Sequence, residues 1–327
     1  MRPTEIKKAL ELLVPLGQPA FVWGAPGVGK SQIVAQTARL LGRELVDLRA
    51  VLLDPVDLRG IPKIGQDDVA RWCPPSFLPR CGSGILFLDE LNAAPPLVQA
   101  ACYQLVLDRK LGEYELPAGW TVVAAGNRES DRAVTHRMPS ALANRFVHLD
   151  FEPSVEDWIA WAQQENMPEE LVAFIRFRPS LLHCFDPSGP EKAFPSPRTW
   201  EYAGRIVQSR PEEALEYALL KGTVGEGAAA EFTGFCRLCR DLPEPEAVLA
   251  APDSAPVPEE PAVLYALCEA LARAMNPATM DGLVRYASRL PAEFGVLLVR
   301  GAAARDKAVL DSGAFTRWAT ANAQVLF

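Results

Sequence analysis

The stretch Pro19-Ala-Phe-Val-Trp-Gly-Ala-Pro-Gly-Val-Gly-Lys-Ser31 decides how the rest of the chain is interpreted. The apolar residues 20–23 predict a short buried strand, and the apolar periodicity that follows Ser31 predicts a helix. Between them, residues 24–31 match the pattern G-x-x-x-x-G-K-[ST], in which glycines let successive backbone N–H groups converge on phosphate oxygens. The sequence therefore predicts a phosphate-binding loop between a strand and a helix.

The residue types in this loop are suited to binding a nucleoside triphosphate. Lys30 supplies a positive charge, and the hydroxyl of Ser31 is placed to ligate Mg²⁺. The alternative is a glycine-rich turn whose Lys-Ser pair is incidental; the strand before it and the helix after it argue against that alternative. The candidate nucleotide-binding residues are Gly24, Ala25, Pro26, Gly27, Val28, Gly29, Lys30 and Ser31.

The composition is that of an ordinary globular protein. The chain's 327 residues are enough for one large or two modest domains. Hydrophobic residues make up 49% and charged residues 23% of the chain, as is usual for globular proteins. The net charge of −8 speaks against a nucleic-acid or anionic membrane surface. Seven scattered cysteines are unlike a secreted disulfide framework, and no apolar run is long enough to cross a bilayer. We therefore expect a cytoplasmic protein without membrane insertion.

A second group of polar residues follows two further predicted strands. Residues 85–90 form an apolar run that ends on Asp89 and Glu90. The first carboxylate can hold Mg²⁺ together with Ser31, and the second can orient and deprotonate an attacking water. Asn127, after the apolar run 121–125, is an amide that can position water or the γ-phosphate. The alternatives are that Asp89 and Glu90 are an ordinary acidic strand end, and that Asn127 after Gly126 belongs to a common turn.

The order of elements predicts an α/β fold. Strands alternate with helices up to residue 152, which indicates a parallel sheet with helices on both faces. Two segments, Leu58–Pro79 and Lys110–Pro117, read as inserted β-hairpins. After Pro153 the pattern is helical, except that 242–262 is rich in Pro, Glu and Ala and is expected to be an extended connector. We predict a nucleotide-binding core over 1–152 and an α-helical part over 153–327.

The motifs, in this order, resemble those of AAA+ ATPases, and more narrowly the MoxR family within the helix-2-insert group. The predicted hairpins are similar to the insertion in helix 2 and to the hairpin before sensor 1. Ser196-Pro-Arg198 is similar to a sensor-2 motif at the start of a lid helix. The resemblance implies a AAA+ P-loop core followed by an α-helical lid and a C-terminal helical extension. It rests on Gly24–Ser31 (Walker A), Leu86–Glu90 (Walker B), Ala125–Asn127 (sensor 1) and Ala141–Phe146.

The resemblance also implies a homo-oligomer, a hexameric ring that hydrolyses ATP with Mg²⁺ at its subunit interfaces. Arg145 matches the arginine finger that enters the neighbouring subunit's site, and a guanidinium suits charge on a transferring phosphoryl group. Arg132 and Arg137 lie close in sequence and could share or replace this role. Arg198 would contact the γ-phosphate from the lid of its own subunit. For Arg145 and Arg198 the alternative is an ordinary surface arginine.

The function that the resemblance implies is remodelling, activation or assembly of a protein client, with a von Willebrand A domain protein as partner. A second hypothesis is a nucleic-acid-dependent motor or restriction-type NTPase, against which the acidic composition speaks. A third is a nucleotide-gated scaffold that does not hydrolyse. The full set of Asp89, Glu90, Asn127 and Arg145 favours hydrolysis over that scaffold.

Overall fold

The computed structural model describes residues 1–131, 136, 138–189, 191–238, 242–276, 278–306 and 312–321. Contacts within the chain divide it into two units. The first comprises Met1–Asp157, Phe185–Pro190 and Ser196–Arg198, and the second comprises Trp158–Cys184, Glu191–Pro195 and Thr199–Phe327. The functional division at residue 152 stays a prediction.

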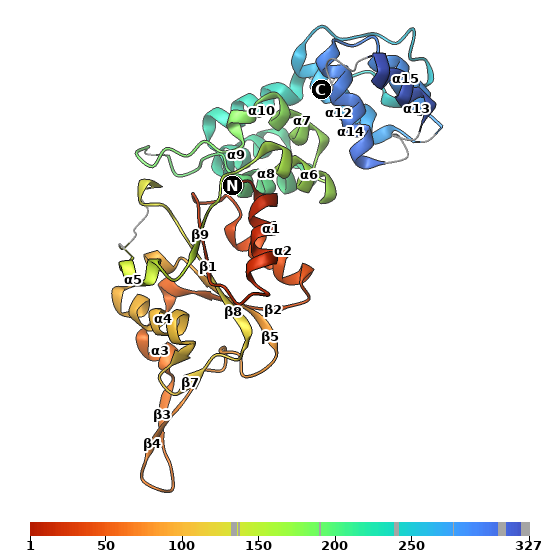
Figure 1. Ribbon diagram of the computed structural model, residues 1–327. Coiled ribbons are helices and arrows are strands. Elements are labelled where there is room, and N and C mark those ends of the chain that lie inside the picture. The colour runs from red at the N-terminus through yellow and green to blue at the C-terminus, as the bar shows by residue number, and fades with distance from the viewer. Residues whose placement is uncertain are drawn as a thin grey trace. The chain divides into compact units, whose positions relative to one another are not determined.

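The first unit is built on a five-stranded parallel sheet in the order β2-β5-β8-β1-β9 (Figure 1). In the register of the sheet, Trp23 lies beside both Gly126 and Asp150, and Arg49 lies beside Asp89. The carboxyl ends of the strands therefore meet at one edge, which is where ligands bind in open parallel sheets. The strands are β1 (Ala20–Trp23), β2 (Glu44–Arg49), β5 (Ser83–Asp89), β8 (Gly119–Gly126) and β9 (Val147–Asp150).

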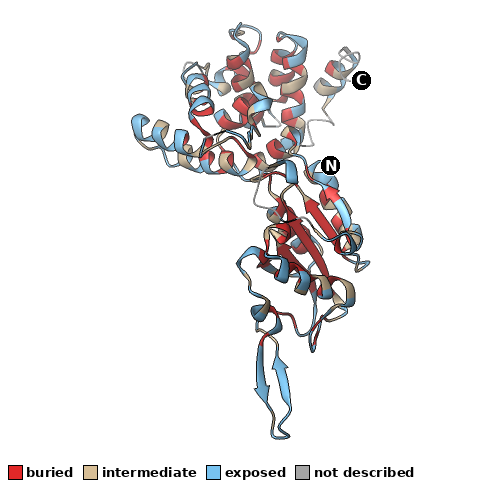
Figure 2. Ribbon diagram, turned by 90° about the vertical axis from the view of Figure 1, so that its left-hand side faces the viewer, coloured by how far each residue is buried: buried red, intermediate tan, exposed pale blue. Residues whose placement is uncertain are grey.

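Helices cover both faces of this sheet (Figure 1). Successive strand residues point to opposite faces: Phe87 and Val123 pack in the core beneath α1 and α2, whereas Leu86 and Val122 pack in the core beneath α4. Burial on both faces explains why the strands are almost continuously apolar, and Figure 2 shows them as buried. The helices of this unit are α1 (Pro3–Leu13), α2 (Lys30–Leu40), α3 (Pro55–Arg59), α4 (Pro96–Asp108) and α5 (Ser140–Ala143), with short 3₁₀ turns at Ala50–Leu52, Leu91–Ala93 and Glu129–Asp131.

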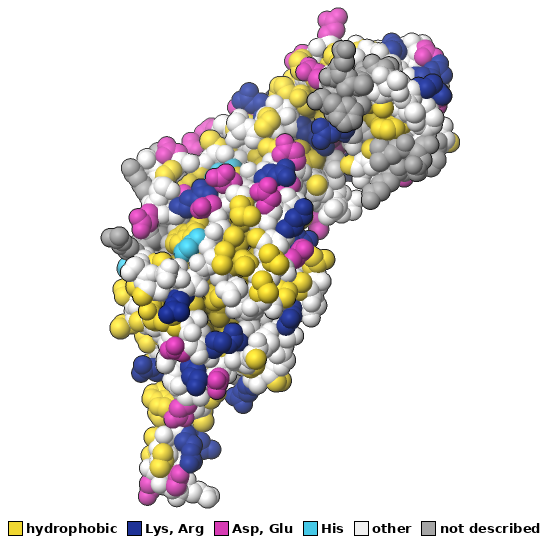
Figure 3. Space-filling view, in the orientation of Figure 1, with side chains coloured by type: hydrophobic (Ala, Val, Ile, Leu, Met, Phe, Trp, Pro, Cys, Tyr) yellow, Lys and Arg dark blue, Asp and Glu magenta, His cyan; other side chains and the backbone are white. Residues whose placement is uncertain are grey.

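Both predicted hairpins are present. The longer pairs β3 (Ile61–Ile64) with β4 (Ala70–Cys73), and the shorter pairs β6 (Lys110–Leu111) with β7 (Tyr114–Glu115). Every residue of β3 and β4 is exposed, and the hairpin extends away from the sheet (Figure 2). Hydrophobic and charged side chains lie next to one another on its surface (Figure 3).

All elements after β9 are helical in the part of the chain that the structure describes. Their core includes residues of α11 to α14, and among these described helices none is both long and apolar enough to cross a bilayer. The predicted fold class, an α/β core with inserted hairpins followed by helices, is confirmed. The elements are α6 (Val155–Gln164), α7 (Glu169–Phe177), a 3₁₀ turn (Pro179–Leu181), α8 (Pro197–Gln208), α9 (Glu213–Val224), α10 (Glu226–Leu238), α11 (Pro245–Ala250), α12 (Pro261–Ala274), α13 (Met280–Ala287), α14 (Ala292–Arg305) and α15 (Gly313–Ala321).

The expected extended connector over 242–262 is wrong in part, because α11 lies within it. Pro245 occupies the first turn of this helix, where a missing N–H removes no helical hydrogen bond. Val248 and Leu249 are buried in the core of the second unit. The proline-rich composition therefore marked a helix start, and tertiary burial of two apolar residues stabilises the short helix.

Candidate nucleotide-binding site

The glycine-rich loop joins β1 to α2 at the carboxyl edge of the sheet. Gly27 and Gly29 have φ angles of 79° and 103°, a left-handed region that residues with a Cβ rarely adopt. Gly24 is needed for a different reason: a Cβ there would lie 3.0 Å from the carbonyl oxygen of Phe151, which follows β9. The loop thus lies directly against the end of the edge strand, with the N-terminus of α2 behind it.

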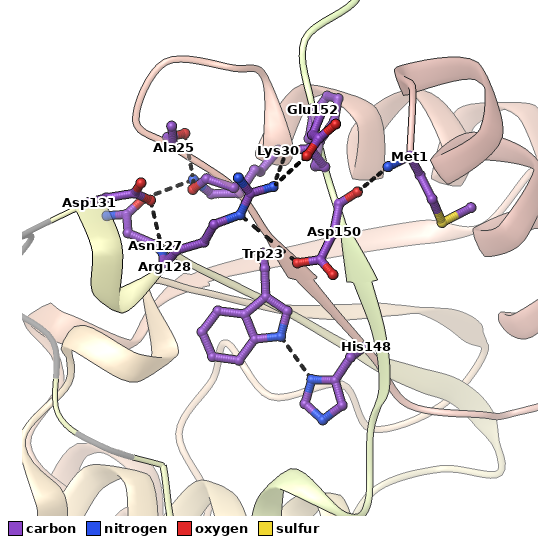
Figure 4. A network of polar contacts seen from close by, with 12 residues as sticks. Met1, Trp23, Ala25, Lys30, Asn127, Arg128, Asp131, His148, Asp150 and Glu152 are labelled. Atoms are coloured by element: carbon purple, nitrogen blue, oxygen red, sulfur yellow. Dashed lines mark hydrogen bonds and ion pairs between the residues drawn. The ribbon is translucent and has the colours of Figure 1, made fainter. Parts of the chain in front are cut away.

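Lys30 is buried in this loop, with 9% of its surface exposed. Its Nζ donates hydrogen bonds to Gly24 O at 2.7 Å, Ala25 O at 3.1 Å and Asn127 Oδ1 at 2.9 Å (Figure 4). All three acceptors are neutral, and Lys30 forms no ion pair with any residue that the structure describes. Burial lowers the pKa of Lys30 to about 8, against the opposing effect of nearby carboxylates such as Asp89. An anionic phosphate would supply the missing countercharge.

Ser31 and Asp89 form a second contact at the same edge. The Ser31 hydroxyl donates to Asp89 Oδ2 at 2.9 Å, and Asp89 Oδ1 accepts a hydrogen bond from the Glu90 backbone N–H at 3.0 Å. Hydroxyl and carboxylate oxygens suit Mg²⁺, which takes few protein ligands when phosphates complete its shell. Among the described residues, no three or more His, Cys, Asp or Glu side chains form a group that could hold a metal ion. The pair therefore fits a nucleotide-associated Mg²⁺ better than a metal held by protein alone.

Glu90 has a left-handed backbone, with φ 55° and ψ 35°. A left-handed residue with a Cβ costs about 1–2 kcal/mol, and such conformations cluster at functional sites. Glu90 is half-buried, and its charge is among those that raise the pKa of Lys30. The structure thus brings Glu90 and Asn127 to the same edge of the sheet as the glycine-rich loop; their catalytic roles stay predictions.

Asn92 belongs to this site and was missed by the sequence analysis. It is 2% exposed, and its Nδ2 donates to the backbone carbonyl of Asn127 at 2.7 Å. A Cβ at Gly126 would lie 2.1 Å from Asn92 Oδ1, so this contact also requires a glycine before Asn127. The available signal was a polar residue within Leu91-Asn92-Ala93-Ala94, directly after the two carboxylates.

The segment Ser196–Arg198 lies against the other side of the loop, within the first unit. The backbone N–H of Arg198 donates to Gly27 O at 3.1 Å, and a Cβ at Gly27 would lie 2.6 Å from Ser196 Oγ. The Arg198 side chain is exposed, and its charge lowers the pKa of Lys30. The structure therefore places the backbone of Arg198 beside the loop, and its predicted contact with the γ-phosphate stays a prediction.

Arg145 lies in the turn between α5 and β9, and its side chain is exposed. Its backbone N–H donates to Leu142 O at 3.0 Å, and no ion pair joins its guanidinium to the described residues. None of the contacts that Lys30, Ser31 and Asp89 make in the structure involves Arg145. The alternatives Arg132 and Arg137 lie outside the described residues.

A glycine-rich loop between a strand and a helix, a buried lysine and a carboxylate at the end of another strand define a P-loop nucleotide-binding protein. Comparison with known proteins narrows this class. Residues 19–146 match the sequence family described as AAA domain (dynein-related subfamily). The chain is 28% identical over 190 residues to midasin of Giardia intestinalis, covering 53% of this chain and 4% of midasin.

The chain is also 29% identical over 148 residues to protein MoxR of Paracoccus denitrificans, covering 42% of this chain and 43% of that protein. It thus spans less than half the length of either relative. The chain is also similar to a solved mutant of Thermotoga maritima RuvB, with 16% identity, 82% of each chain covered and a TM-score of 0.44. Residues 19–146 therefore match an AAA domain, and the chain is similar to protein MoxR over 148 residues.

Proposed function

We propose that this chain binds ATP with Mg²⁺ at the Gly24–Ser31 loop and hydrolyses it between neighbouring subunits of a ring. The observation that carries the proposal is Lys30, a buried cation whose hydrogen bonds all go to neutral oxygens. A buried charge without a counter-ion is costly to fold, so its presence is best explained by a ligand that supplies the opposite charge.

In the proposed reaction, the loop and Lys30 hold the β- and γ-phosphates. Glu90 accepts a proton from a water molecule as its oxygen attacks the γ-phosphorus, and the bond from that phosphorus to the β–γ bridging oxygen breaks, which leaves ADP and phosphate. Asn127, held by Asn92, donates a side-chain N–H toward the γ-phosphate or the water. Bound Mg²⁺, held by Ser31 and Asp89, would neutralise charge on the phosphates.

We assign Arg145 to the site of the neighbouring subunit. Support comes from its exposed side chain, which has no acidic partner among the described residues, and from its position outside the contacts of the loop in its own chain. A guanidinium brought to the γ-phosphate would stabilise the charge of the transition state, an effect worth about 10³- to 10⁵-fold in rate in comparable enzymes. Arg198 would contact the same phosphate within one chain.

The proposed work of the ring, a hexamer in the cytoplasm, is to remodel or activate a protein client, with a von Willebrand A domain protein as partner. The β3–β4 hairpin supports a protein-facing role because it exposes apolar side chains without contributing to the nucleotide site. Ile61 and Ile64 are more than 70% exposed, and Trp72 is 37% exposed. Such side chains on an isolated two-stranded ribbon suit contact with another protein surface.

Mixing of two inactive variants tests the shared site. The Arg145→Ala variant keeps an intact phosphate-binding loop but lacks the arginine that would enter the neighbouring subunit's site. The Lys30→Ala variant keeps that arginine but cannot hold the phosphates. Each alone is expected to show little phosphate release, and a mixture should recover a measurable part of the wild-type rate. Mixed samples that stay as inactive as the separate variants would contradict hydrolysis between subunits.

A further inference from the structure

We propose that His148 and Trp23 are positioning residues for Arg145. Through these two residues, strand β1, which leads into the phosphate-binding loop, holds the turn that carries Arg145 in place. The inference rests on the proposed role of Arg145. Trp23 is the last residue of β1, and Gly24 begins the loop; His148 lies on β9, after the Arg145 turn. These residues therefore join the two ends of the proposed shared site within one chain.

The central contact is a hydrogen bond between neighbouring strands. Trp23 Nε1 donates to His148 Nδ1 at 2.8 Å, and the two side chains point toward each other (Figure 4). The other ring nitrogen, His148 Nε2, lies 2.8 Å from the carbonyl oxygen of Ala143, the last residue of α5. His148 thus bridges β1 to the end of the helix that precedes Arg145.

The partners determine which protons the imidazole carries. An indole N–H can only donate, so His148 Nδ1 must be the acceptor, and a backbone carbonyl can only accept, so Nε2 must carry the hydrogen. Both bonds therefore require the neutral Nε2–H form. Phenylalanine at either position would keep a ring and remove the bond.

Hydrogen bonds close the turn on both sides of Arg145. The Ala143 carbonyl also accepts from the Phe146 backbone N–H at 3.2 Å, and the Leu142 carbonyl accepts from the Arg145 N–H at 3.0 Å. The His148 ring thus binds the same oxygen that ties Ala143 to Phe146. The backbone of Arg145 is fixed although its side chain is exposed.

Ring packing adds a second connection between the same elements. Phe21 stacks on Trp23 with ring centroids 4.0 Å apart and meets Phe146 edge-on at 5.5 Å. Trp23 and His148 are stacked with centroids 5.9 Å apart. Aromatic pairs of this kind contribute beyond the area that they bury. Phe21 therefore contacts Phe146, which follows Arg145 directly, and Trp23 contacts His148, three residues after Arg145, through a directed hydrogen bond.

The physical role that follows is pre-organisation. A charged donor accelerates phosphoryl transfer only if it already lies where charge develops, and a small displacement weakens it. Removing the hydrogen bond of Trp23 and His148 should loosen the Arg145 turn without touching the phosphate contacts of Lys30. We expect Trp23→Phe and His148→Phe each to lower kcat roughly three- to tenfold, the effect of losing about one hydrogen bond. The dissociation constant for MgATP should be unchanged.

Mixed assemblies distinguish this role from a structural one. His148→Phe subunits retain their own Lys30 and Glu90, and Lys30→Ala subunits carry an intact Arg145 turn. In a mixture, a Lys30→Ala subunit can supply its arginine to a neighbouring His148→Phe subunit. Turnover per subunit with an intact Lys30 should therefore rise. The matched control is Val147→Thr on the same strand, whose side chain points to the opposite face and is 39% exposed; it should behave as wild type. In a double-mutant cycle, Trp23→Phe and His148→Phe should be less than additive.

Each alternative outcome is decisive. If Arg145→Ala is rescued by Lys30→Ala subunits but His148→Phe is not, or if the variants change the affinity for MgATP and leave kcat unchanged, the positioning role is wrong. If neither Arg145→Ala nor His148→Phe is rescued, the shared site itself fails, and the inference fails with it. Trp23→Phe keeps the stacked ring, so it tests the hydrogen bond even if His148→Phe folds poorly.

Discussion

Two buried charges, one in each unit, are held in opposite ways. Lys30 in the first unit donates only to neutral oxygens. Glu269 in the second unit is 2% exposed and is fully matched: its Oε1 lies 2.6 Å from Arg176 Nε, and its Oε2 lies 3.6 Å from Arg305 Nη2 and accepts from Gln163 at 3.1 Å.

The difference separates a structural charge from a functional one. Glu269 on α12 joins residues of α6, α7 and α14, and its charge is satisfied within the fold. Lys30, at the edge of a parallel sheet, forms no ion pair with any described residue and donates hydrogen bonds only to neutral oxygens. A charge that the protein does not balance indicates a ligand that does, whereas a balanced charge indicates architecture.

Removing the charge of Lys30 should reduce ATP turnover more than the Glu269 and Asn92 substitutions considered below. Lys30→Met keeps an unbranched side chain of similar length and removes the charge. Turnover of ATP should fall by more than about 100-fold, because the donor to the phosphates is lost. The melting temperature without nucleotide should not fall, because an uncompensated buried charge is removed as well. Phosphate-release assays and thermal melts check both; a stable variant with normal turnover would show that Lys30 is not a functional charge.

Glu269→Gln should show the reverse pattern. Arg176 and Arg305 would lose their counter-ion in a largely buried position, which destabilises the second unit by about 3 kcal/mol. The affinity for MgATP should be unchanged. Chemical denaturation followed by titration with MgATP measures both, with Glu213→Gln as the control, because the Glu213–Arg237 pair is exposed. Equal stability of Glu269→Gln and wild type would mean that the buried network is not structural.

The pH dependence of folding stability provides a further test of the buried Lys30 charge. The pKa of Lys30 is about 8 in the folded protein against 10.5 ordinarily, so the folded state loses this proton first as the pH rises. Below pH 8 the buried cation lowers stability by about 3 kcal/mol, and that loss disappears between pH 8 and 10.5. The unfolding free energy of wild type relative to Lys30→Met should therefore rise across that window. A flat difference would show that Lys30 is not desolvated.

Asn92 should contribute less to turnover than Lys30 does. Asn92→Ala removes the donor to the Asn127 carbonyl, so the amide that contacts Lys30 becomes less well positioned. We expect kcat to fall about tenfold or less, with the affinity for MgATP within twofold of wild type. Stopped-flow binding and steady-state turnover separate the two. A variant that loses affinity without losing kcat would assign Asn92 to binding.

Much of the first unit could be predicted from sequence because its signals are local. The strand, glycines and lysine of residues 20–30 are contiguous, and Asp89 and Glu90 end an unbroken apolar run. That Ser196–Arg198 lies near the loop was expected only from the family resemblance, because the packing of Ser196 on Gly27 joins residues distant in sequence with no periodic pattern between them. The contact of Trp23 with His148 likewise depends on β1 pairing with β9, which periodicity alone does not give.

The most direct test of the account uses Glu90→Gln, in which an amide replaces the proposed proton acceptor. Calorimetric titration with MgATP and measurement of phosphate release should be made on the same sample. The account predicts a dissociation constant within a few-fold of wild type and phosphate release lowered by more than about 100-fold. Undiminished release, or binding lost together with turnover, would contradict the assignment of this edge of the sheet as a site of ATP hydrolysis.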